Sequence, residues 1–334
     1  MTQPYSSPTV ANGTPDVVPA LQRRRCLPPG GLIGTWRAVD GCRLRVAHWP
    51  GPAAAASSGG TILFLNGRGD FIEKYAESYW AFRDWGYAIA TLDWRGQGLS
   101  DRFAGDRERG HQQDIGQLVA DVAAWIDAEG HDWPRPLHLV AHSMGGNIAL
   151  RLLHDHPGLV ERAVVMAPML GIRTRPLPAA VARRLARWQV ARGHGFDFAL
   201  AQGPYGEMAR SVHRQRNLTG DAERFDDEHW WISGNPDLSV GGVTYGWLDA
   251  AFRSIDCVRA PGYLEAIATP VLILAAGIER LVDSAATIAA ATRLPRGTAR
   301  LMEGGRHELV REVDSIRLET FGQIRSFLAG RDGE

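Results

Sequence analysis

The stretch Leu137-His138-Leu139-Val140-Ala141-His142-Ser143-Met144-Gly145-Gly146 decides the fold. A mostly apolar run ends at a serine, two glycines follow, and a helical pattern then begins. This order predicts a strand, a tight turn and a helix, with the serine hydroxyl exposed above the edge of a sheet. The turn is strained and needs small neighbours, which Ala141 and Gly145 provide on either side of Ser143. Short motifs also arise by chance, so the rest of the chain must support this one.

The composition excludes several classes of protein. The chain has 334 residues, and its 37 Lys+Arg balance 37 Asp+Glu, which disfavours nucleic-acid binding. Its three well-separated cysteines, Cys26, Cys42 and Cys257, predict neither a disulfide framework nor a zinc site. Lys74 is the only lysine, and a genome that prefers arginine explains this bias at least as well as any function does.

The amino-terminal segment has the composition of a tail. Residues 1–30 are rich in Pro, Ser, Thr and Asn and contain no apolar core of a secretory signal. No apolar run approaches the roughly 20 residues that span a bilayer. We therefore expect a soluble, cytoplasmic protein with a flexible tail over 1–30, in which Arg23, Arg24 and Arg25 form a solvated basic cluster.

Strand and helix patterns alternate over most of the chain. The apolar runs of strand length lie at 61–65, 87–92, 137–141, 163–166, 271–276 and 299–302. Their alternation with helical patterns predicts an α/β fold with a mostly parallel sheet covered on both faces. Residues 171–255 hold helical patches and no clear strand. We therefore expect an α/β core over 31–170 and 256–334, interrupted by a helical cap insertion over 171–255.

Two loops after predicted strands carry partners for the serine. A serine becomes a good nucleophile when a histidine accepts its proton and a carboxylate orients that histidine. His307 and Glu279 follow Ser143 in the chain order typical of this architecture. Asp283 is the alternative acid, although it also stands where it would cap a helix beginning near 284. A solvated loop histidine is the competing interpretation of His307, which its position after a strand disfavours.

An acyl transfer also needs donors for the developing oxyanion. The backbone N–H of Met144, directly after the nucleophile, is one candidate, and that of Arg68 is the other. Gly67 and Gly69 beside Arg68 would let this loop approach a substrate closely. No pattern predicts a metal site or an organic cofactor.

Together these motifs resemble the α/β-hydrolase superfamily and, within it, bacterial lysophospholipases and monoacylglycerol lipases. The resemblance spans about residues 35–328 and rests on Asn66-Gly67-Arg68-Gly69-Asp70, on Asp93-Trp94-Arg95-Gly96-Gln97-Gly98-Leu99-Ser100, on Ala141 to Gly146, on Glu279-Arg280-Leu281-Val282-Asp283 with His307, and on a cap-like stretch at 235–242. Asn66 replaces the usual histidine and Ala141 the usual glycine, and neither change removes a catalytic group. Asp93 and Arg95 match a turn that we interpret as structural.

The resemblance implies a serine hydrolase that cleaves carboxylic esters through an acyl-serine intermediate. Ser143 would attack, His307 would act as base and then acid, and Glu279 would orient His307. The implied substrates are single-acyl-chain lipids, either lysophospholipids or monoacylglycerols. A broad short-chain carboxylesterase and an acyltransferase are alternatives, and a non-catalytic binding protein on the same scaffold is a further one. The serine nucleophile disfavours epoxide hydrolases and dehalogenases of this fold, which use an aspartate.

The beginning of the expected cap is strongly basic. Residues 162–196 contain seven arginines and no acidic residue, and Val181, Leu185 and Trp188 recur there at helical spacing. Such a helix either lies on an anionic lipid surface beside the active site or packs its apolar face on the protein core. The second arrangement is the commoner one in soluble proteins. Peripheral membrane contact through the cap is therefore the alternative hypothesis.

Overall fold

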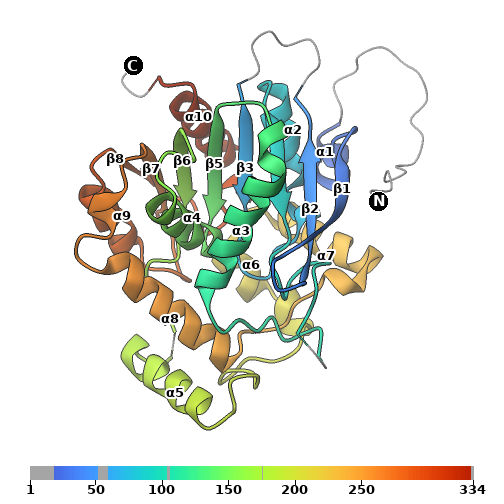
Figure 1. Ribbon diagram of the computed structural model, residues 1–334. Helices are drawn as coiled ribbons and strands as arrows, with labels where there is room; N and C mark the ends of the chain where they lie inside the picture. The colour runs from blue at the N-terminus through green and yellow to red at the C-terminus, as the bar shows by residue number, and fades with distance from the viewer. Residues whose placement is uncertain (1–18, 52–58, 104–105, 175, 332–334) are drawn as a thin grey trace.

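The computed structural model describes residues 19–51, 59–103, 106–174 and 176–331. Its centre is an eight-stranded sheet with the order β1-β2-β4-β3-β5-β6-β7-β8 (Figure 1). Strand β2 is antiparallel to β1 and β4, and the neighbouring pairs from β4 to β8 are parallel. The predicted mostly parallel sheet is confirmed. The strands are β1 (Leu32–Arg37), β2 (Arg43–Trp49), β3 (Thr61–Leu65), β4 (Ala88–Leu92), β5 (Leu137–His142), β6 (Arg162–Met166), β7 (Val271–Ala276) and β8 (Gly297–Met302).

Helices cover both faces of this sheet. Side chains along a strand alternate between the two faces, so Ile62 and Phe64 pack with α2 and α10, whereas Leu63 and Leu65 pack with α3 and α4. This double burial explains the nearly continuous apolar runs of the central strands. The helices around the sheet are α2 (Ala76–Asp84), α3 (Ile115–Glu129), α4 (Met144–Asp155), α9 (Ser284–Arg293) and α10 (Asp314–Leu328). Short 3-10 turns are η1 (Ile72–Tyr75), η2 (Gly130–Asp132), η3 (Glu207–Arg210), η4 (Pro236–Leu238), η5 (Leu264–Ala266) and η6 (Leu309–Arg311).

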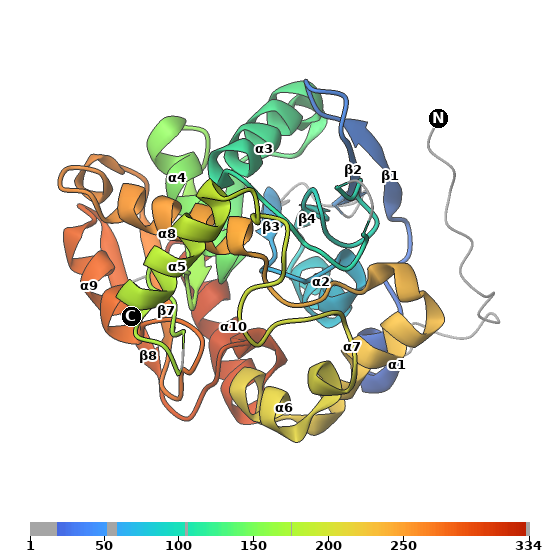
Figure 2. The same ribbon diagram turned by 90° about the horizontal axis from the view of Figure 1, so that it is seen from below.

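The stretch between β6 and β7, which we call the cap segment, gathers at one end of the sheet (Figures 1 and 2). It contains α5 (Ala179–Ala191), α6 (Val212–Leu218), α7 (Ala222–Gly234) and α8 (Tyr245–Arg259). Helix α5 packs along α8, and α8 continues beyond the boundary expected at 255. Within the ranges described, no helix is both long enough and apolar enough to cross a bilayer.

Helix α1 (Ala20–Arg25) lies inside the stretch for which the sequence predicts a flexible tail. Arg23 forms an ion pair with Asp84 of α2, and Arg24 and Arg25 both pair with Asp227 of α7. The expected solvated cluster is thus a set of ion pairs, because the fold brings acidic groups distant in sequence to these arginines. Residues 1–18 of the expected tail lie outside the described ranges.

The turn from β5 to α4 shows why small residues surround Ser143. The backbone of Ser143 has φ 53° and ψ −115°, in the left-handed half of conformational space that side chains rarely adopt. A Cβ atom added at Gly145 would lie 2.2 Å from the carbonyl oxygen of Leu65 and 2.5 Å from that of Asn66. The start of α4 therefore rests directly on the backbone at the end of β3.

This contact predicts opposite effects for two glycine-to-alanine changes. Gly145→Ala should lower the free energy of unfolding by about 1–3 kcal/mol, because backbone atoms cannot move aside as a flexible side chain can. Gly322→Ala, in α10 with open space around it, should raise that free energy by about 0.5–1 kcal/mol. Urea unfolding of both variants checks this. Equal stability of the two would contradict the close approach at Gly145.

Candidate active site

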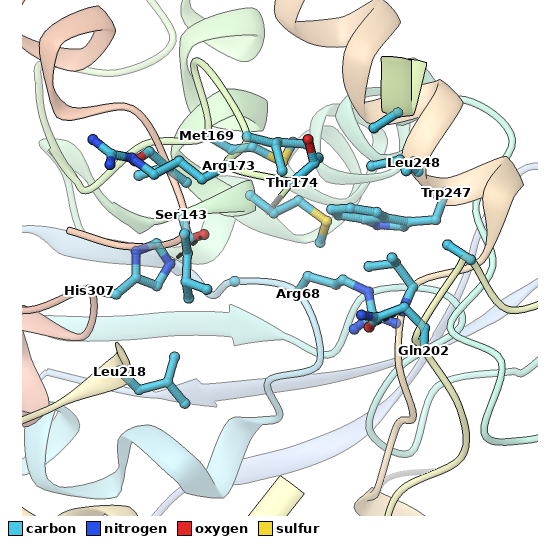
Figure 3. A pocket seen from close by; sticks show the side chains of 18 of the residues that line it. Arg68, Ser143, Met169, Arg173, Thr174, Gln202, Leu218, Trp247, Leu248 and His307 are labelled. Atoms are coloured by element: carbon cyan, nitrogen blue, oxygen red, sulfur yellow. Dashed lines mark hydrogen bonds between the residues drawn. The ribbon is translucent and has the colours of Figure 1, made fainter. Parts of the chain in front are cut away.

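The loops at the carboxyl edge of the sheet hold the predicted site residues. Arg68 follows β3, Ser143 follows β5, Glu279 follows β7 and His307 follows β8. Because these strands are parallel, all four loops leave the sheet at the same edge, where open α/β sheets bind their ligands. Figure 3 shows Ser143 and His307 beside each other in a pocket at this edge.

Ser143, His307 and Glu279 form a continuous chain of hydrogen bonds. The distance from Ser143 Oγ to His307 Nε2 is 2.9 Å, and that from His307 Nδ1 to Glu279 Oε2 is 2.8 Å. The other carboxylate oxygen, Oε1, accepts the backbone N–H groups of Arg280, Leu281 and Val282 at 2.9, 2.7 and 3.3 Å. These bonds fix the carboxylate, which in turn fixes the imidazole. This geometry suits proton transfer from the hydroxyl to Nε2.

Asp283, the alternative acid, occupies a different place. Its carboxylate oxygen Oδ1 accepts the backbone N–H groups of Ala285 and Ala286 at 3.0 and 3.3 Å, and so caps the first turn of α9. Of the two candidates, the structure places only Glu279 against His307. The short loop after β7 directs Glu279 inward, whereas Asp283 already begins the next helix.

The two charges of the histidine–glutamate pair stabilise each other. Burial alone would lower the pKa of His307, but the charge of Glu279 and the hydrogen bond to it raise this pKa above its ordinary value of 6.5, with help from Glu308 and Asp70. Burial likewise works to raise the pKa of Glu279, and the neighbouring His307 holds it below 4.5. Glu279 thus remains a carboxylate that favours the imidazolium form of His307.

The candidate oxyanion donors lie on both sides of Ser143. Met144 is the first residue of α4, a position whose N–H has no acceptor inside the helix. Among the described residues no acceptor is found for the N–H of Arg68, whereas the N–H of Gly67 donates to Asp70 Oδ2 at 2.8 Å. A Cβ atom at Gly67 would lie 3.3 Å from that of Ser143, so this loop touches the serine turn. Both free N–H groups suit a developing negative oxygen.

A buried ion cluster beneath the pocket was not predicted from the sequence. The Nζ atom of Lys74 lies 2.6 Å from Asp70, 2.8 Å from Glu228 and 2.7 Å from Glu308, and the side chain of Lys74 is only 2% exposed. Arg311 joins the cluster through Glu308 at 2.7 Å. The one signal in the sequence was that Lys74 is the only lysine, which does not identify its partners.

Hydrogen bonds connect this cluster to the serine and histidine loops. Asp70 Oδ2 accepts the hydroxyl of Tyr75 at 2.8 Å, and that hydroxyl lies 3.0 Å from His142 Nδ1. His142 Nε2 donates to the backbone carbonyl of His307 at 3.0 Å. The residue before Ser143 therefore holds the backbone of the loop that carries His307.

The pocket has a volume of about 330 Å³, within the range of small-molecule sites. Ser143, His307 and several charged groups line it. Most of the remaining wall is apolar and comes largely from the cap segment, including Leu177, Leu185, Ala199, Leu200, Leu218, Val243, Trp247 and Leu248. The part of the chain that the structure describes contains no group of three or more His, Cys, Asp or Glu residues arranged to hold a metal ion.

Comparison with known proteins places this geometry in a family. The family model described as serine aminopeptidase, S33, matches residues 56–314. The chain belongs to this family. Lysophospholipase L2 of Escherichia coli strain K12 is 30% identical over 275 residues, which cover 80% of this chain and 79% of that protein. The monoglyceride lipase of Mus musculus is 22% identical over 296 residues, or 88% of this chain and 89% of that one.

Among solved structures, a soluble variant of monoglyceride lipase from Saccharomyces cerevisiae in complex with a substrate analog is similar to this S33 family member. Its TM-score is 0.70 at 16% sequence identity, over 97% of this chain and 100% of that chain. At this identity the likeness concerns the fold alone, and it confirms the predicted α/β-hydrolase fold.

The histidine–glutamate contact predicts a pKa shift that can be measured directly. In an NMR titration the imidazole of His307, assigned by its absence in His307→Ala, should have a pKa above 6.5. Glu279→Gln should lower that pKa, because a neutral amide no longer stabilises the imidazolium. Asp283→Asn, the matched control, should leave it unchanged because Asp283 faces α9. A larger shift in the control than in Glu279→Gln would assign the contact to Asp283 instead.

Proposed function

We propose that the protein is a serine hydrolase that cleaves carboxylic esters of single-chain lipids through an acyl-serine intermediate. The observation that carries the proposal is the hydrogen-bonded chain from Ser143 through His307 to Glu279, placed in a largely apolar pocket. Membership of the S33 family and the similarity to a lysophospholipase and to monoglyceride lipases support it.

In each half of this mechanism His307 takes up one proton and then gives it away. Ser143 Oγ attacks the ester carbonyl carbon while His307 Nε2 takes its proton, and the backbone N–H groups of Arg68 and Met144 hold the resulting oxyanion. The C–O bond to the alcohol then breaks, and His307 returns the proton to the departing oxygen. A water molecule next attacks the acyl-serine while His307 Nε2 takes a proton from it, and His307 returns this proton to Ser143 Oγ as the acyl–oxygen bond breaks and the fatty acid leaves.

The pocket wall indicates the kind of acyl group. Leucine, valine and tryptophan side chains of the cap segment line the same pocket as Ser143 and offer apolar surface to an alkyl chain. An acyltransferase would form the same acyl-serine and pass it to an alcohol, and a short-chain carboxylesterase would leave much of this apolar wall unused. Rates over a series of acyl lengths and acceptors separate these alternatives.

The catalytic assignment predicts large losses from single substitutions. Ser143→Ala and His307→Ala should each lower kcat for p-nitrophenyl ester hydrolysis by about 10⁴-fold or more, as in other triads. Ser315→Ala, at an exposed serine of α10 that does not line the pocket, is the matched control and should retain the rate. Near-normal turnover in a folded Ser143→Ala protein would contradict the mechanism.

We also propose that the cap segment contacts a lipid surface through α5. The helix packs on α8 through Ala182 and Ala186, whereas Val181 and Trp188 are 47% and 53% exposed. Of the three apolar residues expected to pack on the core, Leu185 does so, whereas Val181 and Trp188 do not. Leu200, which is 62% exposed, also lines the pocket, so this apolar surface borders the pocket that holds Ser143.

The arginines of α5 set the charge of this surface. Arg183 forms an ion pair with Asp256 of α8, but Arg184 and Arg187 are exposed and have no carboxylate within ion-pair distance among the described residues. An apolar face with neighbouring arginines is the combination that binds anionic membrane interfaces. This arrangement would present the pocket to lipids in a bilayer.

Vesicle sedimentation tests this contact. Binding to anionic vesicles should exceed binding to neutral ones and should weaken at high salt, because salt screens charges over about 10 Å at 0.1 M. Arg184→Glu/Arg187→Glu should remove the salt-sensitive part, and Trp188→Ala should weaken binding at every salt concentration. Arg216→Glu, on α6, serves as the charge control. Equal and weak binding of all proteins to both vesicle types would remove the membrane contact.

A further inference from the structure

We infer that Arg68 and Arg214 form an anion subsite that binds the phosphate of the substrate's head group. This subsite would make the enzyme favour phosphate-bearing esters over neutral ones. The inference rests on the proposed ester hydrolysis, since it specifies which part of the substrate each end of the pocket holds. Both arginines line the pocket that contains Ser143.

The guanidinium of Arg68 has N–H donors that make no hydrogen bond among the described residues. Among the described residues its hydrogen bonds run only from Nη2, to the carbonyl oxygens of Gly241 at 2.9 Å and Gly242 at 2.6 Å. Its Nε–H is shielded from solvent and has no acceptor there. A guanidinium carries five N–H donors, and a buried donor without an acceptor costs free energy. An incoming anion would satisfy this group.

Arg68 also lacks a counter-ion, unlike the enclosed Arg45 and Arg95. Arg45 pairs with Glu73 and Asp93, and Arg95 pairs with Asp40 and Asp121. No carboxylate lies within ion-pair distance of Arg68 in the described part of the chain, and the uncharged ring of Trp247 lies 5.3 Å from the guanidinium carbon. Burial, reinforced by the positive charge of Arg214, lowers the pKa of Arg68 to about 9. A bound anion would act as the missing counter-ion and would raise the pKa of Arg68 again.

The charge balance of the pocket favours an anion. Four cationic side chains line it, against two carboxylates, Asp70 and Glu308. Both carboxylates already contact Lys74 at 2.6 and 2.7 Å, so they do not neutralise the arginines. Arg214, whose side chain is 43% exposed, forms a long ion pair with Glu228 at 3.6 Å, and Glu228 also contacts Lys74 at 2.8 Å. Positive charge thus remains available on the pocket wall.

The position of Arg68 relates the subsite to the reacting ester. Its backbone is next to Ser143, and Figure 3 shows its side chain running away from Ser143 toward Gln202, below Trp247. In a lysophospholipid the glycerol backbone separates the ester carbonyl from the phosphate by a span similar to that of an extended arginine side chain. With the oxyanion at the Arg68 N–H, the phosphate would come near the guanidinium. The acyl chain would then follow the apolar wall.

Another role for Arg68 is purely structural, since its two hydrogen bonds attach the turn at Gly241 and Gly242 of the cap segment to the loop after β3. That role would make every substrate equally sensitive to a change at Arg68. Arg214 separates the two interpretations, because it makes no hydrogen bond to this turn among the described residues. Substitutions at Arg214 therefore test the charge of the subsite without removing the clamp.

The test compares a phosphate-bearing and a neutral ester with the same acyl chain. The kcat/KM of the full-length protein is measured for hexanoyl lysophosphatidate and for monohexanoylglycerol, both below their micelle concentrations. Arg214→Gln and Arg68→Lys should each lower the ratio of the two values by about tenfold or more, because a charge-assisted or bidentate phosphate contact is lost. Arg216→Gln removes the same charge from α6 at a position that does not line the pocket, and should leave the ratio unchanged.

A second measurement identifies the source of the phosphate. With p-nitrophenyl butyrate as substrate, glycerol 3-phosphate should inhibit the wild type competitively, and Arg214→Gln should weaken this inhibition. Inorganic phosphate inhibiting equally well, with no preference for the phosphate-bearing ester, would indicate a free-anion site and overturn the head-group assignment.

The outcomes distinguish this inference from the proposed function. Unchanged ratios in both arginine variants, with ester hydrolysis intact, would overturn the subsite and leave the hydrolase in place. Failure of the wild type to hydrolyse any ester, or to react at Ser143 with a phosphonylating serine probe, would overturn the proposed function itself.

Discussion

A single ammonium group joins the segments from which the site is built. Lys74 contacts Asp70 from the loop after β3, Glu308 from the loop after β8 and Glu228 from α7 of the cap segment. Burial by itself would lower the pKa of Lys74, but these three carboxylates hold it above the ordinary value, so the group stays charged. A buried charge that loses its partner costs about 3–5 kcal/mol. Separating any of the three segments would leave a buried charge without a partner. Lys74 therefore holds the cap segment against the loops that carry Arg68 and His307.

The same cluster shapes the chemistry above it. Asp70 holds the N–H of Gly67, which leaves the next N–H along the loop, that of Arg68, unoccupied. Tyr75 and His142 extend the contact to the backbone carbonyl of His307. The negative charges of Glu308 and Asp70 also add to the effect of Glu279 in raising the pKa of His307. Groups outside the chain of hydrogen bonds from Ser143 to Glu279 thereby set both the position and the basicity of the imidazole.

The sequence predicted the features that depend on local pattern. Buried strands appear as apolar runs such as 61–65, and the serine turn, the strand-end positions of Glu279 and His307 and the capping position of Asp283 are all set within a few residues. Features that depend on pairs distant in sequence were missed. The arginines of α1 look solvated until α7 supplies Asp227, and nothing near Lys74 in sequence indicates Glu228 or Glu308. The exposed side of α5 was also undetermined, because Ala182 and Ala186 compete with Val181 and Trp188 for the packing face.

The two departures from the family pattern follow from the same close packing. Asn66 is fully buried, its side-chain Nδ2 donates to the backbone carbonyl of Leu92 at 2.9 Å, and its backbone carbonyl accepts the indole N–H of Trp94 at 2.9 Å. These bonds join the ends of β3 and β4, so the side chain at this position serves the fold, and asparagine performs that role without an imidazole. Ala141 lies inside β5 opposite Leu65 and Val165, where its methyl group is part of the core. Gly145, by contrast, faces the carbonyl oxygens at the end of β3. The strict requirement for glycine therefore falls after Ser143 and not before it, because only there does the backbone of a neighbouring strand fill the space of a side chain.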